Sequence, residues 1–282
     1  NDVFYFANDW LTSFYNSPEI MDSGKQSLNN NKMLEAITNN DFRSLLKLVV
    51  ENPIAHVNRS EYLAKVFKVT ESDIINGHLD ISLKERKKVA QKQITATVRN
   101  TTVISFLTGI PGGIAIAGTI PGDIIQNMVY SIRLAQQLAY IYDFDDLIEE
   151  DGKIRTNGLL LFLGTMAGVN GSASLLRVSS SNAIKYASKQ ILGKPLMKTL
   201  WYPLLKKITS IVAGKTLTRK GLASGIAKIV PVVGGVTSGS ITMIGMEMSA
   251  KKLNSELLRG FEQNYSERDY EKDIKIIEAE II

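Results

Sequence analysis

The sequence predicts an all-α protein, a compact helical bundle whose core helices are rich in glycine and pack tightly. Apolar residues recur at spacings of three and four in almost every periodic segment. No stretch shows the period of two that marks a strand. Small residues also recur four apart: GxxxG spacing occurs five times, as in Gly164/Gly168, where about one or two pairs are expected by chance. Such spacing lets helix backbones approach closely.

Helices are expected in order along the chain. The first covers residues 31–52. The second follows a capping box formed by Ser82 and Glu85, in which each side chain satisfies the other residue's backbone N–H, and it runs toward Gly109. Pro121 suits the first turn of the third helix, which ends near residue 144. Further helices are expected over residues 158–168, 182–192, 195–213, 221–258 and 266–282.

This pattern suggests three parts: an N-terminal helical segment over residues 1–78, a glycine-rich helical domain over 79–260 and a charged C-terminal helix over 261–282. The polar stretch LNNNK, residues 28–32, is the expected linker. The chain has 282 residues and no cysteine, which excludes disulfides, zinc–thiolate sites and thiol catalysis. Its first residues lack the basic and apolar regions of a signal peptide.

Charge is distributed unevenly along the chain. Residues 152–246 contain no aspartate or glutamate but 13 lysines and arginines, and the remaining residues carry 20 basic and 28 acidic groups. Either this acid-free half meets an anionic surface, or it neutralises the acidic segment 143–152 and the C-terminal tail. For the first alternative, the expected contacts are Lys185, Lys189, Lys198, Lys206, Lys207 and Lys215.

The helix after the glycine run carries a polar stripe on an otherwise apolar surface. Its residues fall within an arc of roughly 100°; they are Asp123, Gln126, Tyr130, Arg133, Gln137 and Tyr140. Because the rest of the helix is mostly apolar, it should be buried, and the stripe then needs partners or water. We take this stripe as the candidate ligand-binding site. An internal hydrogen-bonded network, the wall of a cleft and a narrow solvated face all remain open.

Motifs of catalysis and cofactor binding are missing from the sequence. The two histidines, His56 and His78, have no metal-site spacing, and GKT at 214–216 lacks the leading glycine of a P-loop because Thr209 stands there. No GxSxG is present. We therefore expect no catalytic residue, metal or cofactor. Basic residues with interleaved aromatics are sparse, so nucleic acid is not expected as a partner.

Three windows lack charge over a length that could cross a bilayer: residues 100–122, 158–176 and 229–246. Each is diluted by glycine, serine, threonine, asparagine or proline, and Pro111 would leave backbone carbonyls unpaired in hydrocarbon. They are either buried helices packed through glycine or segments able to insert into a membrane.

The stretch TGIPGG, followed by IPGDIIQNMVYSIRLAQQLAYIYDFD, resembles the signature of the EcsC family of bacterial proteins. The matching residues are Pro111, Gly112, Gly113, Asp123, Arg133, Ala139 and Tyr142, with Asp143 where a glycine usually follows. The resemblance covers roughly residues 82–258. Founding members of the family are encoded beside an ABC transporter, so the resemblance implies a membrane transporter as a partner. It carries over no catalytic residues.

Together these patterns predict a non-enzymatic bacterial protein in the cytoplasm, peripheral to the inner face of the cell membrane. Its acid-free half would bind an anionic lipid surface or a lipid-like apolar ligand. One alternative is a pore-forming or toxin-like protein whose uncharged helices insert into membranes. A second is an enzyme with Asp123 as acid–base and Arg133 as anion clamp.

Overall fold

The computed structural model describes residues 42–50, 55–77, 80–108, 122–144, 156–180, 203–204, 206–212, 238–261 and 265–281, with Lys32, Ala183 and Tyr186. Two compact units divide between Leu48 and Val49, inside helix α3 (Phe42–Val50). In the first unit the described residues are Lys32 and the beginning of α3. The second unit, 49–282, holds every other described element. The division predicted after residue 78 is a different one, and it stays a prediction.

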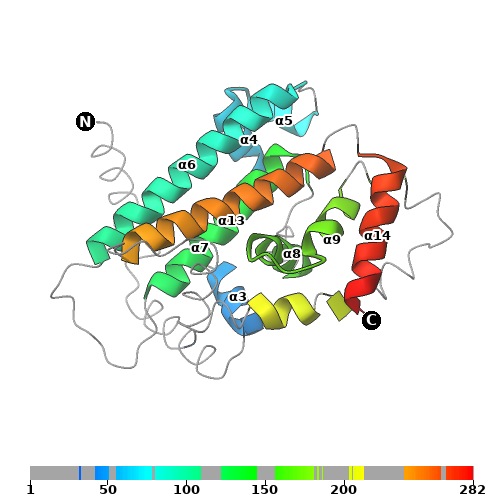
Figure 1. The fold of residues 1–282 in the computed structure, drawn as a ribbon. Coiled ribbons are helices and arrows are strands. Elements are labelled where there is room, and N and C mark those ends of the chain that lie inside the picture. Colours follow the sequence, from blue (N-terminus) through cyan, green and yellow to red (C-terminus); the bar gives the residue numbers. More distant parts are fainter. Residues whose placement is uncertain are drawn as a thin grey trace. The chain divides into compact units, whose positions relative to one another are not determined.

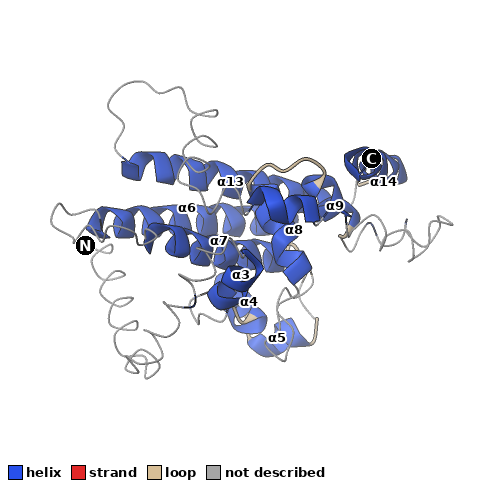
Figure 2. Ribbon diagram, turned by 90° about the horizontal axis from the view of Figure 1, so that it is seen from below, coloured by secondary structure: helices blue, strands red, loops and turns tan. Residues whose placement is uncertain are grey.

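In the described residues of the second unit every regular element is a helix and none is a strand, which confirms the predicted all-α class. Its longest helices are α6 (Leu83–Thr108), α7 (Gly122–Ile141) and α13 (Ser238–Phe261). These three lie side by side and contact one another in pairs, as both views show (Figure 1, Figure 2). They form the body on which the shorter helices pack.

Two groups of shorter helices pack against this body. Helix α4 (Arg59–Phe67) contacts α7 and leads into α5 (Glu71–Ile75). Helices α8 (Thr156–Met166) and α9 (Ser172–Val178) contact α13, and the C-terminal helix α14 (Glu267–Ile281) packs against α9 (Figure 1). Helix α14 matches the charged helix expected at the end of the chain.

Helix α7 lies at the centre of this arrangement. From Met128 to its end at Ile141 it is buried on nearly every side, with Ser131 and Arg133 the partial exceptions. The prediction that a mostly apolar helix is buried is therefore confirmed. It packs between the inward faces of α6 and α13, where Ile94 and Leu253 are fully buried. Burial of this apolar surface is the main stabilising contribution.

Local sequence signals place several helix starts. At α6, the Ser82 hydroxyl accepts a hydrogen bond from the Glu85 backbone N–H (3.3 Å), one of the two bonds of the expected capping box. Asn58 caps α4 in the same way, with its side chain accepting from Glu61 N (3.1 Å). Thr70 forms a complete capping box at α5 with the carboxylate of Asp73.

Glycine serves two purposes in the pair Gly164/Gly168. A Cβ added at Gly164 would lie 2.6 Å from the Ile208 side chain, so this glycine permits a close approach between α8 and the segment 206–212. Gly168 instead has φ +72°, in the turn after α8, and is exposed. Tight packing through glycine is thus confirmed at Gly164, while its GxxxG partner ends a helix.

The uncharged window 158–176 is not one helix. It comprises most of α8 and α9, separated by a turn in which Gly168 and Gly171 both have positive φ. All of window 100–122 lies outside the residues whose side chains are described, and so does window 229–246 apart from its last two residues. Within the described part of the chain, no helix combines the length and the apolar character of a membrane span.

Candidate functional site

The polar stripe of α7 is the first candidate site. Four of its six residues have described side chains: Tyr130, Arg133, Gln137 and Tyr140. Asp123 and Gln126 lie in the first turns of α7, and their side chains fall outside the described set. The proposed pairing of Asp123 as acid–base with Arg133 is therefore untested.

The described part of the stripe joins an internal hydrogen-bonded network. The side-chain oxygen Oε1 of Gln137 accepts a hydrogen bond from Gln93 Nε2 of α6 (2.9 Å). The side-chain oxygen Oε1 of Gln93 in turn accepts one from the Tyr62 hydroxyl of α4 (3.3 Å). The chain Tyr62–Gln93–Gln137 links three helices through neutral groups. Because such bonds satisfy amides that would otherwise be buried unpaired, this end of the stripe orders the packing of α4, α6 and α7.

Arg133 is the charged residue in the described part of the stripe, and its guanidinium donates to the His56 backbone carbonyl oxygen (3.0 Å). Burial lowers the pKa of Arg133, and the nearby Tyr130, Tyr62 and Glu61 oppose this shift. Burial also raises the pKa of Tyr130 to about 12, with Arg133 acting in the opposite direction. Burial raises the pKa of Tyr62 in the same way, so Tyr62 and Tyr130 both stay neutral near pH 7. A half-buried guanidinium among phenols and carbonyls is a structural contact that also leaves part of its surface open to solvent.

Gln136 is a structural residue that the stripe does not include. It is fully buried, its amide nitrogen donates to the Ala55 carbonyl (2.6 Å), and its carbonyl oxygen accepts from Val57 N (3.3 Å). One side chain thereby fixes the extended segment before α4 on α7. The sequence signal was a glutamine on the apolar side of a helix, where burial requires hydrogen-bond partners.

Two arginines gather at the C-terminal end of α7. The buried guanidinium of Arg86 donates to the Ile141 carbonyl, pairs with Asp143 (2.9 Å) and lies over the Phe261 ring (4.8 Å). Arg59 donates to the Phe144 carbonyl (2.8 Å). These cations satisfy terminal carbonyls and oppose the negative end of the helix dipole.

Asp143 itself has φ +55°, the left-handed conformation in which glycine is commonest. In this chain the aspartate tolerates the conformation and adds a carboxylate for Arg86.

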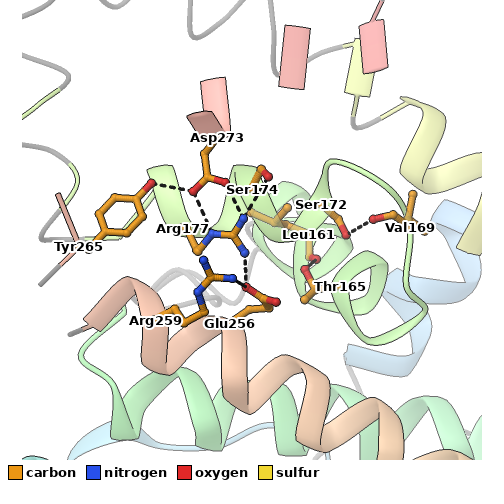
Figure 3. Close-up of polar contacts among 10 residues, drawn as sticks. All are labelled: Leu161, Thr165, Val169, Ser172, Ser174, Arg177, Glu256, Arg259, Tyr265 and Asp273. Atoms are coloured by element: carbon orange, nitrogen blue, oxygen red, sulfur yellow. Dashed lines mark hydrogen bonds and ion pairs between the residues drawn. The ribbon is translucent and has the colours of Figure 1, made fainter. Parts of the chain in front are cut away.

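A second polar cluster connects α9, α13 and α14, and we call it the Arg177 cluster (Figure 3). Arg177 of α9 binds both carboxylate oxygens of Asp273 on α14, through Nε (2.8 Å) and Nη2 (2.5 Å), and also pairs with Glu256 of α13. The Tyr265 hydroxyl donates to Asp273 (2.8 Å), and Arg177 donates to the Ser174 hydroxyl (3.1 Å). Arg177 and Asp273 are both buried.

The electrostatics of the Arg177 cluster are those of a closed ion network. Although burial opposes the charge, pairing with Asp273 and Glu256 raises the pKa of Arg177. Burial and the neighbouring Asp273 raise the pKa of Tyr265. The bidentate geometry orients the guanidinium and links three helices. The cluster is suited to holding α14 in place, because its charges are directed at one another.

The six lysines expected to meet an anionic surface are mostly beyond the described residues. Lys185, Lys189, Lys198 and Lys215 lie outside them, whereas Lys206 and Lys207 are exposed. Lys207 forms an ion pair with Glu280 of α14 (2.5 Å). With Arg177, two of the three described cations of the acid-free half are therefore neutralised from α13 and α14, as the second sequence alternative expected.

The described residues contain no group of three or more potential metal ligands. Comparisons of the chain with models of protein families, with curated proteins and with solved structures find no match. The resemblance to the EcsC family thus stays a sequence-level expectation.

Proposed function

We propose that this chain is a non-enzymatic helical protein that associates with an anionic membrane surface through its acid-free half, on the cytoplasmic face. One observation supports this most directly. The described acids that pair with cations of this half are Glu256, Asp273 and Glu280, and the cations that they pair with are Arg177 and Lys207. Lys206, next to Lys207 in the sequence, is exposed and forms no ion pair with a described residue.

The proposal draws on the imbalance of the whole segment. Thirteen cations without an acid within residues 152–246 give a local excess of positive charge. Internal pairing accounts for Arg177 and Lys207 and removes Arg177 from any surface role, because it is buried. Each lysine close to an anionic bilayer contributes about 1 kcal/mol to binding. A handful of such contacts gives reversible, salt-sensitive association.

Co-sedimentation with vesicles tests this proposal. At low salt, the protein should pellet with phosphatidylcholine vesicles that contain phosphatidylserine and stay in solution with phosphatidylcholine alone. The variant K185E/K189E/K198E should lose binding, and K251E/K272E/K275E, with the same change in net charge on α13 and α14, should retain it. Equal pelleting with both kinds of vesicle would contradict the proposal.

Dye release from the same vesicles separates surface binding from the pore-forming alternative. Binding without leakage supports the peripheral mode. Leakage that depends on anionic lipid would favour insertion of the uncharged segments instead.

A further inference from the structure

Helix α6 presents a basic face that the rest of the chain does not use. The side buried against α7 and α13 includes Ala90, Ile94 and Val98. On the opposite side, within an arc of about 80° at 100° per residue, exposed basic side chains follow one another along about 22 Å of helix. They are Lys84, Lys88, Lys92 and Arg99, which we call the α6 basic face.

This face conflicts with the local rules of helix stability. Lys84 and Lys88, and again Lys88 and Lys92, stand four residues apart, where like charges repel. Lys84 and Lys88 also lie in the first two turns, at the positive end of the helix dipole. The helix contains one acid, Glu85, among six basic residues. A local rule broken without a gain inside the fold points to a partner outside it.

The described residues provide no counter-ions for this face. None of its four cations forms an ion pair with them, whereas lysines on other helices do: Lys251 pairs with Glu247 (2.6 Å) and Lys207 with Glu280 (2.5 Å). Arg86, within the same basic run, is directed inward to Ile141 and Asp143. The chain thus pairs the inward cation Arg86 and leaves the four cations of the α6 basic face exposed to solvent.

We propose that the α6 basic face docks on the headgroups of an anionic lipid bilayer. This inference rests on the proposed function and assigns it a second surface. In Figure 1, α6 and the segment 206–212 that carries Lys206 lie far apart, with α13 and α8 between them. The α6 basic face is therefore separate from Lys206 and Lys207, the two described lysines among those expected from the sequence.

Several features favour a bilayer over nucleic acid as the occupant. Three of the four cations are lysines, which act as non-directional point charges and lack the planar fork that reads bases and phosphates bidentately. Between Lys84 and Arg99 the other exposed side chains are Glu85, Lys87, Gln91, Thr95 and Ala96, and none has an aromatic ring on which a base could stack. A straight row of cations on one convex helix fits a flat charged plane.

The test uses the full chain with the reversal variant K84E/K88E/K92E. Its matched control is K251E/K272E/K275E, and circular dichroism verifies that both retain the helical fold. At low salt, binding to phosphatidylserine-containing vesicles should fall on the order of a hundredfold for the α6 variant and change little for the control. Unchanged binding by the α6 variant would overturn the inference.

The outcomes separate this inference from the proposal on which it rests. If the wild-type chain ignores anionic vesicles, the proposed function fails, and the inference fails with it. If K185E/K189E/K198E abolishes binding and K84E/K88E/K92E does not, only the inference fails. Duplex DNA provides the last comparison. If the wild-type chain binds DNA but not anionic vesicles at low salt, and the α6 variant loses that DNA binding, the face binds nucleic acid. The inference of a bilayer as its partner would then be wrong.

Discussion

The Arg177 cluster and the α6 basic face differ in how their cations are stabilised. Arg177 is buried and bonded to two carboxylates and a hydroxyl from three helices. Lys84, Lys88 and Lys92 are exposed and stand in a row beside like charges. A buried guanidinium without partners would carry a large desolvation penalty, whereas an exposed lysine stays hydrated and needs no partner within the fold.

The run LKERKK contains both kinds of cation, paired and solvent-exposed, within six residues. Arg86 is directed inward to the end of α7, while Lys84 and Lys88 are directed outward. Helical periodicity explains the difference, since residues two apart lie about 200° apart around the axis. Density of basic residues in the sequence therefore says little about their role until the buried side of the helix is known.

The largest effect is expected at Arg177. Arg177→Met leaves Asp273 and Glu256 without their common partner, and we expect a loss of about 3–5 kcal/mol in the free energy of unfolding, measured with urea. The control is Arg259→Met, because Arg259 is exposed and 3.7 Å from Glu256; it should cost less than about 0.5 kcal/mol. Similar losses in the two variants would show that the cluster does not hold α14.

Arg86→Met should have the next largest effect. It removes the bond to the Ile141 carbonyl and the ion pair with Asp143. We expect a loss of about 2–3 kcal/mol, since an uncapped buried carbonyl loses its charged donor. Lys88→Met in the same run should change stability by less than about 0.5 kcal/mol. If both substitutions lower the free energy of unfolding in urea by the same amount, the distinction between inward and outward cations is wrong.

The loss of stability in Tyr265→Phe is expected to be smaller, because this substitution removes one hydrogen bond, from the Tyr265 hydroxyl to Asp273 (2.8 Å). At neutral pH the loss should be about 1–2 kcal/mol. Tyr186→Phe is the control: its hydroxyl donates to a neutral backbone carbonyl (3.0 Å) and should contribute less.

The same variant makes a prediction about pH. The folded state raises the pKa of Tyr265 above its usual value of about 10. The corresponding stability is complete below that pH and is lost as the pH rises beyond it, because the unfolded state releases the proton first. Tyr265→Phe should therefore flatten the alkaline decline in stability, measured by urea unfolding between neutral and alkaline pH. A decline as steep as in the wild type would exclude this contribution.

The smallest effect is a gain. Lys88→Glu removes two like-charge contacts and places an anion near the helix N-terminus, so stability should rise by about 0.3–1 kcal/mol. Lys275→Glu is the opposite control, because Glu271 and Glu278 lie four and three residues away on α14, and stability should fall slightly. A loss on reversing Lys88 would mean that this lysine has a structural partner.

Much of the helical framework was predictable from the sequence. The spacing of apolar residues indicated α3, α6, α7, α8, α13 and α14, and Ser82 marked the start of α6. Helices α4, α5 and α9 were not predicted. Asn58 and the Thr70–Asp73 pair were available as start signals for the first two. Helix α9 spans seven residues after Gly171 (φ +78°), too few for periodicity to be recognised.

The candidate site was predicted only in part. The α7 stripe has two described residues in hydrogen bonds to other elements, Arg133 and Gln137. Gln136 and the Arg177 cluster were not predicted, since the backbone groups before α4 that Gln136 binds and the carboxylates that Arg177 binds are 79 or more residues away in the sequence. Lys206 and Lys207 were predicted together, yet an ion pair with Glu280 was found at only one of them.

The sequence by itself indicated most of the longer helices, the apolar sides of those helices and the absence of acids from residues 152–246, because periodicity and composition are local properties. Only the tertiary structure decided which cations are neutralised. Arg86, Arg177 and Lys207 have partners because distant helices deliver a carbonyl or carboxylate to them. Lys84, Lys88 and Lys92 have none among the described residues because their side of α6 is directed away from α7 and α13.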